Sequence, residues 1–150
     1  MYNYIRDIVT DFKQYYPSNK NARTYAANHL FKVRNYQKKF PETLAQVFHT
    51  FTAQALFATK QAQLDIHTTV AFLTTRVLCP DDDDWTKLVR FIRYLCATLT
   101  LPLILSSDST NIVKWWVDGS FGVHPDTRSQ TGGTASLGKG SFISMSIKQN

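Results

Sequence analysis

The chain has 150 residues, of which 43% are hydrophobic and 13% aromatic, and this composition excludes an intrinsically disordered protein. Its 17 lysine and arginine residues outnumber its 11 acidic residues, so the net charge is +6. No apolar run approaches the roughly 20 residues of a membrane-spanning helix, and the start of the chain is too polar for a signal peptide. We therefore expect one soluble intracellular domain, or the joined pieces of two, with no membrane partner.

The acidic and metal-ligating residues leave few catalytic options. Glu42 is the one glutamate beside ten aspartates, which excludes chemistry that needs a glutamate in the second half of the chain. The four histidines and two cysteines show no zinc-ligand spacing. Cys79 and Cys96 lie too far apart along neighbouring predicted helices to form a disulfide, and two free thiols fit a reducing compartment.

The first part of the chain, residues 1–40, predicts a short helix followed by an irregular segment. Apolar side chains recur at helical spacing within residues 2–16, namely Ile5, Ile8, Val9 and Phe12. Residues 17–21 then interrupt the pattern with turn formers. Residues 22–40 are basic and without a regular period, so we expect them to form loops.

Residues 41–100 predict three helices that pack as antiparallel neighbours, because the joints between them are short. Pro41 and Glu42 are a typical helix start. Asp65 is expected to cap a second helix, which ends at Cys79 and Pro80. The third helix is expected to begin within four consecutive aspartates, residues 81–84. These aspartates could hold a metal, but carboxylates also cap the free N–H groups of a helix start, and we favour the cap.

After Thr100 the hydrophobic period changes from helical to strand-like. Strands are predicted over 112–117, 133–138 and 141–147, with Gly138, Lys139 and Gly140 as a hairpin turn. Such a small antiparallel sheet needs a cover on its other face, which this sequence does not obviously supply. The predicted class is therefore α+β, with a helical part followed by an incomplete sheet.

Asp118 is the strongest candidate for a catalytic or metal-binding residue. It ends the predicted strand 112–117 and is followed by the small residues Gly119 and Ser120. A carboxylate at the end of a central strand is a usual first ligand in two-metal nucleases. Aspartates also end strands simply because they start turns, so both interpretations stay open here.

Three basic residues of the third predicted helix form a candidate nucleic-acid interface. Lys87, Arg90 and Arg93 are expected to lie opposite the apolar stripe of that helix. Such a face could follow phosphates, each contact adding salt-dependent affinity. The alternative is an ordinary solvated helix face.

Several segments together resemble the polyprotein of copia-type long-terminal-repeat retrotransposons, from the end of the reverse transcriptase into the start of ribonuclease H. They resemble, in order, the family's Thr-Pro-Ala segment, its Arg-Pro-Asp-Ile helix, its Arg-x-Leu-Arg-Tyr-Leu helix, its Asp-Ala strand end, its Arg-Ser-x-Ser-Gly turn and its Ser-x-Lys-Gln strand. The corresponding residues are 24–31, 64–73, 87–95, 116–121, 128–133 and 146–149. Each segment is weak alone, and the shared order and spacing carry the resemblance. Tyr25 and Leu64 stand where the family prefers proline, and Ala97 where it prefers glycine.

The resemblance implies a division of the chain and a set of roles. Residues 1–40 would be an irregular N-terminal segment, 41–100 the helical thumb and connection region, and 101–150 the first strands of a ribonuclease H-like domain. Asp118 would be the first Mg²⁺-binding carboxylate of the parent enzyme. Lys87, Arg90 and Arg93, with Lys148 of the last motif, would face a template–primer duplex or an RNA–DNA hybrid. The setting would be a cytoplasmic virus-like particle or the nucleus.

The parent enzyme would synthesise DNA on an RNA template and degrade the RNA of the hybrid. The family's polymerase motif Tyr-x-Asp-Asp would lie before Met1, and its second ribonuclease H carboxylate, in Ser-Thr-Glu-Ala-Glu, after Asn150. Because two-metal cleavage needs several carboxylates, we expect this chain alone to be inactive and to bind no Mg²⁺ tightly. The remainder of the polyprotein would be its partner. The alternatives are a non-catalytic basic nucleic-acid-binding module and a functionless retroelement relic.

Overall fold

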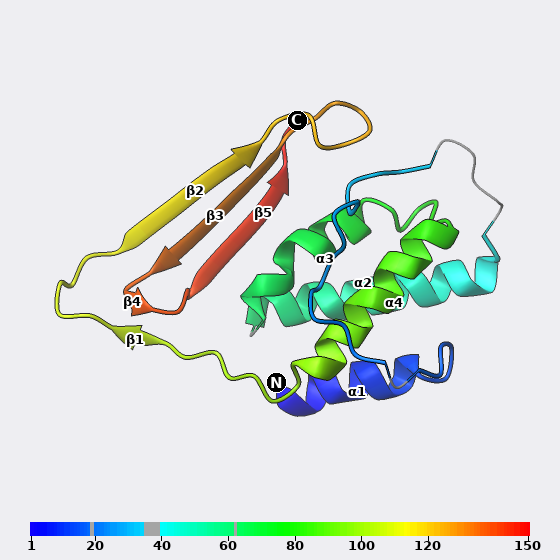
Figure 1. The fold of residues 1–150 in the computed structure, drawn as a ribbon, viewed down its shortest axis with the longest axis horizontal. Helices are drawn as coiled ribbons and strands as arrows, with labels where there is room; N and C mark the ends of the chain where they lie inside the picture. The colour runs from blue at the N-terminus through cyan, green and yellow to red at the C-terminus, as the bar shows by residue number, and fades with distance from the viewer. Residues whose placement is uncertain (19, 35–39, 62) are drawn as a thin grey trace.

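The computed structural model describes residues 1–18, 20–34, 40–61 and 63–150, and it is an α+β fold in which four helices precede small antiparallel sheets (Figure 1). The helices and the short 3₁₀ turn η1 are α1 (Tyr2–Phe12), α2 (Glu42–Gln61), η1 (Leu64–Ile66), α3 (His67–Thr74) and α4 (Asp82–Ala97). The strands are β1 (Ser106–Ser107), β2 (Lys114–Ser120), β3 (Gln130–Ser136), β4 (Gly138–Lys139) and β5 (Ile143–Lys148). We call the described residues up to 100 the helical unit and residues 101–150 the strand unit.

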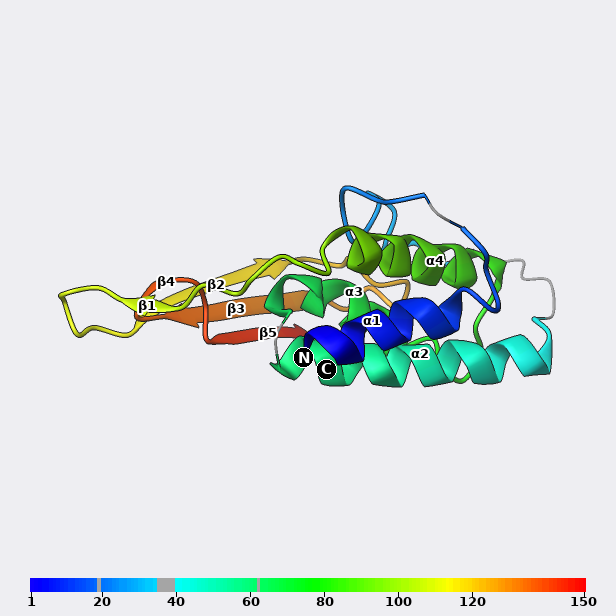
Figure 2. The ribbon, with the colours of Figure 1, turned by 90° about the horizontal axis from the view of Figure 1, so that it is seen from below.

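The helical unit is built around one apolar core. The predicted stripe of α1 is confirmed, since Ile5, Ile8, Val9 and Phe12 are all buried. Helix α1 packs against α2 and α4, and Figure 2 shows the three lying along one another. Aromatic rings pack against each other where these helices meet, and the centroids of the Phe12 and Phe51 rings lie 4.9 Å apart in an edge-to-face arrangement. Residues before and after position 41 therefore share a single core.

The second predicted helix is shorter than expected at both ends. Asp65 does not cap it, because this residue lies inside η1, and α3 begins at His67 without a side-chain cap. Helix α3 ends at Thr74 rather than near Cys79. The backbone N–H of Thr75 and its hydroxyl both bond to the carbonyl of Phe72, three residues back, and this tighter pattern ends the α-helical ladder.

The interpretation of the four aspartates as a helix start is confirmed. Asp81 is the N-cap of α4, and its Oδ1 accepts hydrogen bonds from the backbone N–H groups of Asp83 and Asp84, each at 2.8 Å. Asp84 accepts in return from the backbone N–H of Asp81 at 3.2 Å, which completes a capping box. Arg76 binds the same carboxylate through Nε at 2.8 Å. Helix α4 is thereby tied to the turn that follows α3.

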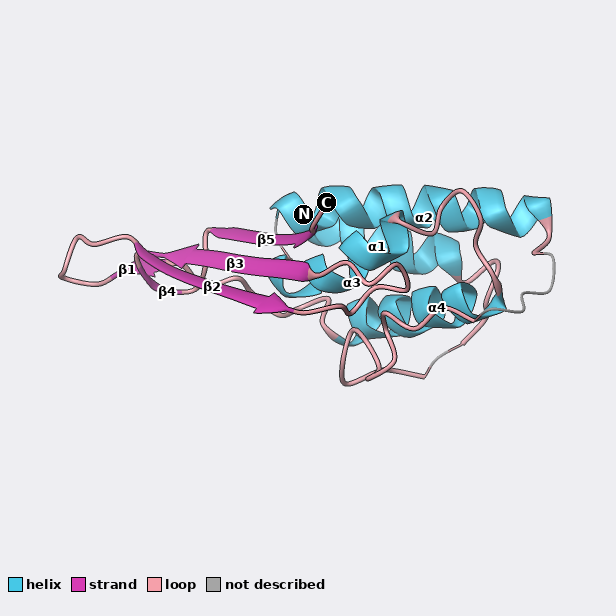
Figure 3. Cartoon of the chain, turned by 90° about the horizontal axis from the view of Figure 1, so that it is seen from above, coloured by secondary structure: helices cyan, strands magenta, loops and turns pink. Residues whose placement is uncertain are grey.

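The strand unit contains a three-stranded antiparallel sheet, as the sequence predicts, and the structure gives its order as β2–β3–β5, with a small β1–β4 pair beside it. Strand β5 lies against α3, and Figure 3 shows the sheet extending from that end of the helical unit. Within the described chain no helix has both the length and the apolar character needed to cross a bilayer.

The predicted turn at Gly138–Gly140 does lie in the connection between the antiparallel strands β3 and β5, but this connection is not a simple turn, because Gly138 and Lys139 form β4 and pair with Ser107 and Ser106. The close approach of the two backbones explains the glycines. A Cβ on Gly138 would stand 2.5 Å from the carbonyl oxygen of Ser106. Gly140 has a φ of +71°, a left-handed conformation that favours glycine.

Candidate functional site

Asp118 lies within β2 and not at its end, which corrects the predicted strand boundary. Strand β2 continues to Ser120 because Gly119 and Ser120 still pair with Thr131 and Gln130 of β3. The Asp118 side chain is exposed, and its Oδ1 accepts a hydrogen bond from the backbone N–H of Gly119 at 2.8 Å. Its cross-strand neighbour is Gly132, so the strand opposite it offers no side chain to cover the carboxylate.

A shallow groove on the sheet surrounds Asp118, and its lining does not make a Mg²⁺ site. The other residues that line the groove are Trp116, Val117, Gly132, Gly133, Thr134, Ser144 and Met145, none of which is a carboxylate. Across the described part of the chain, no group of three or more His, Cys, Asp or Glu side chains could hold a metal ion. Mg²⁺ needs near-octahedral oxygen coordination, and Asp118 supplies one ligating group. The residues present therefore do not fit the ion by themselves.

The predicted exposed position of Lys87 is wrong. Its side chain is buried on α4, and Nζ lies 2.9 Å from Oδ2 of Asp83, one helical turn earlier. The same ammonium donates a hydrogen bond to the backbone carbonyl of Lys32 at 2.6 Å and lies 4.6 Å from the centroid of the Phe72 ring. The residue is covered because the segment 20–34 crosses α4 there. Lys87 thus joins this segment to the helix and is already neutralised by Asp83.

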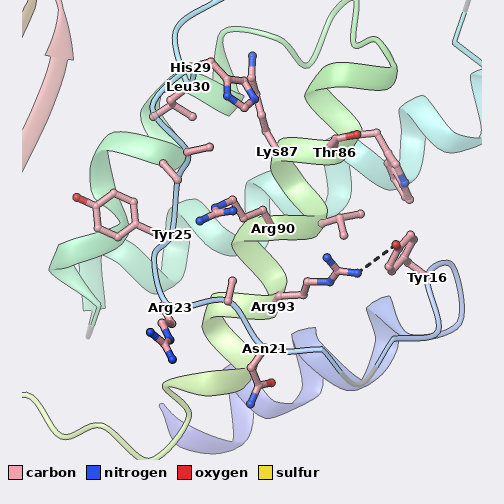
Figure 4. A pocket seen from close by; sticks show the side chains of 15 residues that line it. Tyr16, Asn21, Arg23, Tyr25, His29, Leu30, Thr86, Lys87, Arg90 and Arg93 are labelled. Atoms are coloured by element: carbon pink, nitrogen blue, oxygen red, sulfur yellow. Dashed lines mark hydrogen bonds between the residues drawn. The ribbon is translucent and has the colours of Figure 1, made fainter.

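Arg90 and Arg93 lie on the same side of α4 but are half-buried, so the predicted open basic face is not formed. The guanidinium of Arg90 donates to Oγ1 of Thr24 at 2.8 Å, and that of Arg93 donates to the hydroxyls of Tyr16 and Ser18, each at 3.2 Å. These partners belong to the chain between α1 and α2. Figure 4 shows the two arginines inside a cleft between this chain and α4. The cleft has a volume of about 490 Å³.

Lys148, the fourth predicted nucleic-acid contact, belongs to the strand unit. It ends β5, and its Nζ lies 2.7 Å from Oδ2 of Asp126 in the loop between β2 and β3. The hydrogen bond from Lys148 lowers the pKa of the Asp126 carboxyl below its ordinary value. The predicted basic residues therefore come from two different parts of the fold, and Lys87 and Lys148 are each held in an ion pair.

A buried polar network in the strand unit was not predicted from the sequence. Nε2 of His124 and Oε1 of Gln130 are 2.7 Å apart, and Nε2 of Gln130 donates to Oγ of Ser146 at 2.7 Å. All three side chains are buried, and the His124 ring contacts Phe31 of the helical unit with centroids 5.0 Å apart. Polar residues of this kind carry no periodic signal, because their burial depends on which strands become neighbours. The network fastens the β2–β3 loop to the sheet and to the helical unit.

Comparison of the chain with protein-family models, with curated proteins and with solved structures finds no match. The resemblance to copia-type polyproteins therefore stays a prediction that rests on the sequence segments alone.

Proposed function

We propose that this chain is a piece of a copia-type retrotransposon reverse transcriptase and ribonuclease H, spanning the joint between the two activities. The helical unit would be the thumb and connection region, and the strand unit would be the opening sheet of the ribonuclease H-like domain. The observation that carries the proposal is the β2–β3–β5 sheet, which follows the helices in the chain and has the exposed Asp118 on its first strand. The parent activity would be RNA-directed DNA synthesis with degradation of the RNA strand of the hybrid.

The apolar surface of the strand unit supports a role for the remainder of the polyprotein as partner. Successive side chains along a strand point to opposite sides of the sheet. The pairing of both strands with β3 puts Trp115 and Val117 of β2 on the same side as Ile147 of β5, whereas Asp118 and Lys148 point to the other side. The three apolar side chains are 54%, 72% and 56% exposed. Large apolar side chains that share one exposed side of a sheet are suited to a contact with another polypeptide. Under the proposal, a further segment of the same polyprotein packs on this side.

The first test is to read the gene on both sides of this reading frame. The proposal expects a Tyr-x-Asp-Asp motif upstream and a Ser-Thr-Glu-Ala-Glu motif downstream in one continuous frame. Stop codons or frameshifts at both borders would instead identify a relic. Flanking sequence that encodes an unrelated, uninterrupted protein would overturn the proposal.

The second test is enzymatic and uses both the chain alone and the longer polyprotein. Alone, the chain should leave an RNA–DNA hybrid intact in the presence of Mg²⁺, because Asp118 has no carboxylate neighbour in its groove. In the longer protein Asp118→Asn should abolish cleavage of the RNA strand. Asp126→Asn is the matched control, since Asp126 is also exposed in the strand unit but pairs with Lys148. Cleavage that survives Asp118→Asn would contradict the assigned role.

A further inference from the structure

Strand β2 is an open edge of the three-stranded sheet. Among the described residues it pairs with β3 alone, and Figure 1 shows it along the free border of the sheet. The other edge strand, β5, lies against α3. Native proteins protect edge strands with prolines, bulges or a covering element, because an open edge is a template for another strand. Strand β2 contains no proline, and its register with β3 runs from Lys114 to Ser120 without a bulge.

The backbone groups of every second residue in β2 point toward this open edge. The N–H of Gln149 donates to the carbonyl of Ser129, directly before β3, at 2.9 Å, so odd-numbered residues of β3 bond to β5 and even-numbered ones to β2. Through the β2–β3 register, the even-numbered residues of β2 bond to β3. Trp115, Val117 and Gly119 therefore direct their N–H and C=O groups away from β3. The bond from the Gly119 N–H to Oδ1 of Asp118 agrees with this direction.

The side chains of β2 are complementary to an antiparallel second copy of the same strand. If Trp116 lies on the twofold axis, Lys114 of one copy stands opposite Asp118 of the other, and Trp115 stands opposite Val117. Trp115 and Val117 then form hydrogen-bonded pairs, and Trp116 meets its own copy at a non-hydrogen-bonded position, where side chains come closest. Opposite charges and aromatic pairs at facing positions stabilise a sheet.

Neighbouring registers lack this match. A register centred on Trp115 would place Lys114 opposite Trp116, and one centred on Val117 would place it opposite Ser120. Both registers lose the two charge pairs. The charge pattern of β2 therefore selects the register centred on Trp116.

The groups that this pairing needs are accessible. The side chains of Trp115, Trp116 and Val117 are each more than half exposed. Asp118 is exposed, and its second carboxylate oxygen, Oδ2, can accept a hydrogen bond from the other copy. The Lys114 side chain is 40% exposed and pairs with Asp108. Because an ammonium has three N–H groups, Lys114 can also donate to a second carboxylate.

We propose that two copies of this chain pair through β2, antiparallel and centred on Trp116, so that their two sheets become one. The inference goes beyond the proposed function and does not depend on it, because it uses only the residues of β2. A strand of seven residues is small beside the roughly 20–30 residues that each partner contributes to a standard interface. We therefore expect a dissociation constant of about 10–100 µM.

The first test is sedimentation equilibrium of the whole chain between about 1 and 500 µM, a range that brackets the expected dissociation constant. The chain should change from monomer to dimer across this range. The indole N–H signals of Trp115 and Trp116 in NMR spectra should shift over the same concentrations. Trp85 is the internal control, because it packs against the core of the helical unit and should not respond.

Charge reversal tests the register. Asp118→Lys and Lys114→Asp each place like charges opposite one another in the pair, so each variant alone should dimerise at least about tenfold more weakly. An equimolar mixture of the two variants should dimerise again, because both pairs of opposite charges are then restored. Asp126→Lys and Lys139→Asp are the matched controls, since they make the same charge changes on exposed residues of the strand unit outside β2.

A proline in β2 tests the backbone contact without changing charge. Val117→Pro removes an N–H that points away from β3, so the pairing of β2 with β3 should be kept. This variant should remain monomeric at all concentrations of the test. Unchanged amide signals of β3 and β5 would show that it is folded.

Three outcomes would overturn the inference. A wild-type chain that stays monomeric throughout the concentration range would exclude the dimer. A dimer that persists in Val117→Pro, or that leaves the Trp115 and Trp116 signals unshifted, would place the contact elsewhere on the molecule. A mixture of the two charge variants that associates no better than each variant alone would contradict the register.

Discussion

The helical unit and the strand unit bury their apolar side chains very differently. Within the described residues, every buried apolar side chain except Ala135 lies before residue 96. The strand unit instead leaves its large apolar residues in solvent, including both tryptophans of β2, which are 54% and 51% exposed. Both units have regular backbone hydrogen bonds, so the difference lies in the side chains.

This contrast indicates that different interactions stabilise the two units. The helical unit has a core in which residues of α1, α2, α3 and α4 cover one another, so hydrophobic burial stabilises it. A three-stranded sheet with an uncovered apolar side has little such burial. It depends on the buried network of His124, Gln130 and Ser146 and on its contact with α3. Five predictions test this contrast, and their expected effects decrease from a core phenylalanine to an exposed ion pair.

Truncation of a phenylalanine should have different consequences in the two units. Phe48 of α2 is 0% exposed, and Phe48→Ala should lower the free energy of unfolding by about 3–5 kcal/mol through lost burial and the cavity left behind. Phe121, after β2, is 95% exposed, and Phe121→Ala should change the free energy of unfolding by less than about 0.5 kcal/mol. Chemical denaturation measures both. Equal effects would show that the exposed side of the strand unit is covered in solution.

Loss of the buried glutamine should destabilise the strand unit more than loss of an exposed one. Gln130→Ala leaves the side chains of His124 and Ser146 without their partner, at a cost of about 1–3 kcal/mol. Gln149→Ala removes an exposed hydrogen bond to Thr131 and should cost less than about 1 kcal/mol. Amide hydrogen exchange of β3 and β5 reports the difference. If Gln149→Ala had the larger effect, the network would not be what anchors the sheet.

Removal of the α4 cap should cost about 1 kcal/mol. Asp81→Ala deletes the acceptor of two backbone N–H groups, whereas Asp81→Asn retains an oxygen in the same place. Asp82→Ala is the control, because Asp82 lies in the same first turn but is exposed. Thermal unfolding should rank wild type and Asp81→Asn above Asp81→Ala. An equal loss in Asp82→Ala would indicate that charge near the helix start, and not the cap, is responsible.

Tyr94 should be the source of a pH-dependent contact in the helical unit. Its hydroxyl donates to Oδ2 of Asp65, and burial together with this carboxylate raises the tyrosine pKa from 10.0 to about 12. Because the pKa of Tyr94 is higher in the folded state than in the unfolded state, the hydrogen bond to Asp65 is fully present below pH 10. It is lost as the pH rises through about 12. In an absorbance titration that follows tyrosinate, the step with the highest pKa should be missing in Tyr94→Phe. If that step persists, the raised pKa belongs to another tyrosine.

The smallest effect is expected for an exposed ion pair of the strand unit. Lys114 donates to Asp108 and, with Thr110, lowers the pKa of that carboxyl from 3.8 to about 2. Whatever stability the pair contributes is present above pH 3.8 and is lost as the pH falls through about 2.

Lys114→Gln should return the Asp108 pKa toward its ordinary value with little change in stability, since exposed pairs contribute little. The carboxyl NMR titration of Asp126, which pairs with Lys148, is the control and should not change. A large loss of stability in Lys114→Gln would mean that this pair is part of the structural anchor. The buried Asp84 behaves in the opposite way, because desolvation raises its carboxyl pKa above the ordinary value despite Arg76.

Much of the local structure could be predicted from particular residues. The spacing of Ile5, Ile8 and Phe12 predicted α1, and the aspartates at 81–84 predicted the start of α4. The end of α3 could not be predicted, because a threonine can stand inside a helix or bond back to the carbonyl three residues earlier, as Thr75 does to Phe72. The boundary of β2 was missed for a related reason. A strand continues past small residues when a partner strand lies beside them, as β3 does here.

The candidate sites were predicted less well than the elements. Asp118 was singled out and is exposed on the sheet, but no local pattern could show that its groove lacks a second carboxylate. Lys87 was placed on an open face because helical periodicity describes the sides of one helix only. It says nothing of a distant segment that crosses the helix, and Lys32, 55 residues away, is the acceptor that Lys87 binds.

Neighbouring residues in the sequence were enough to predict the α+β class, the order of helices before strands, the α1 stripe and the α4 cap, because each depends on residues within one or two turns. The burial of Lys87, the cleft lined by Arg90 and Arg93, and the buried network of Gln130 became visible in the folded chain and not in the sequence pattern. These properties depend on pairs far apart in the chain, and local periodicity carries no information about such pairs.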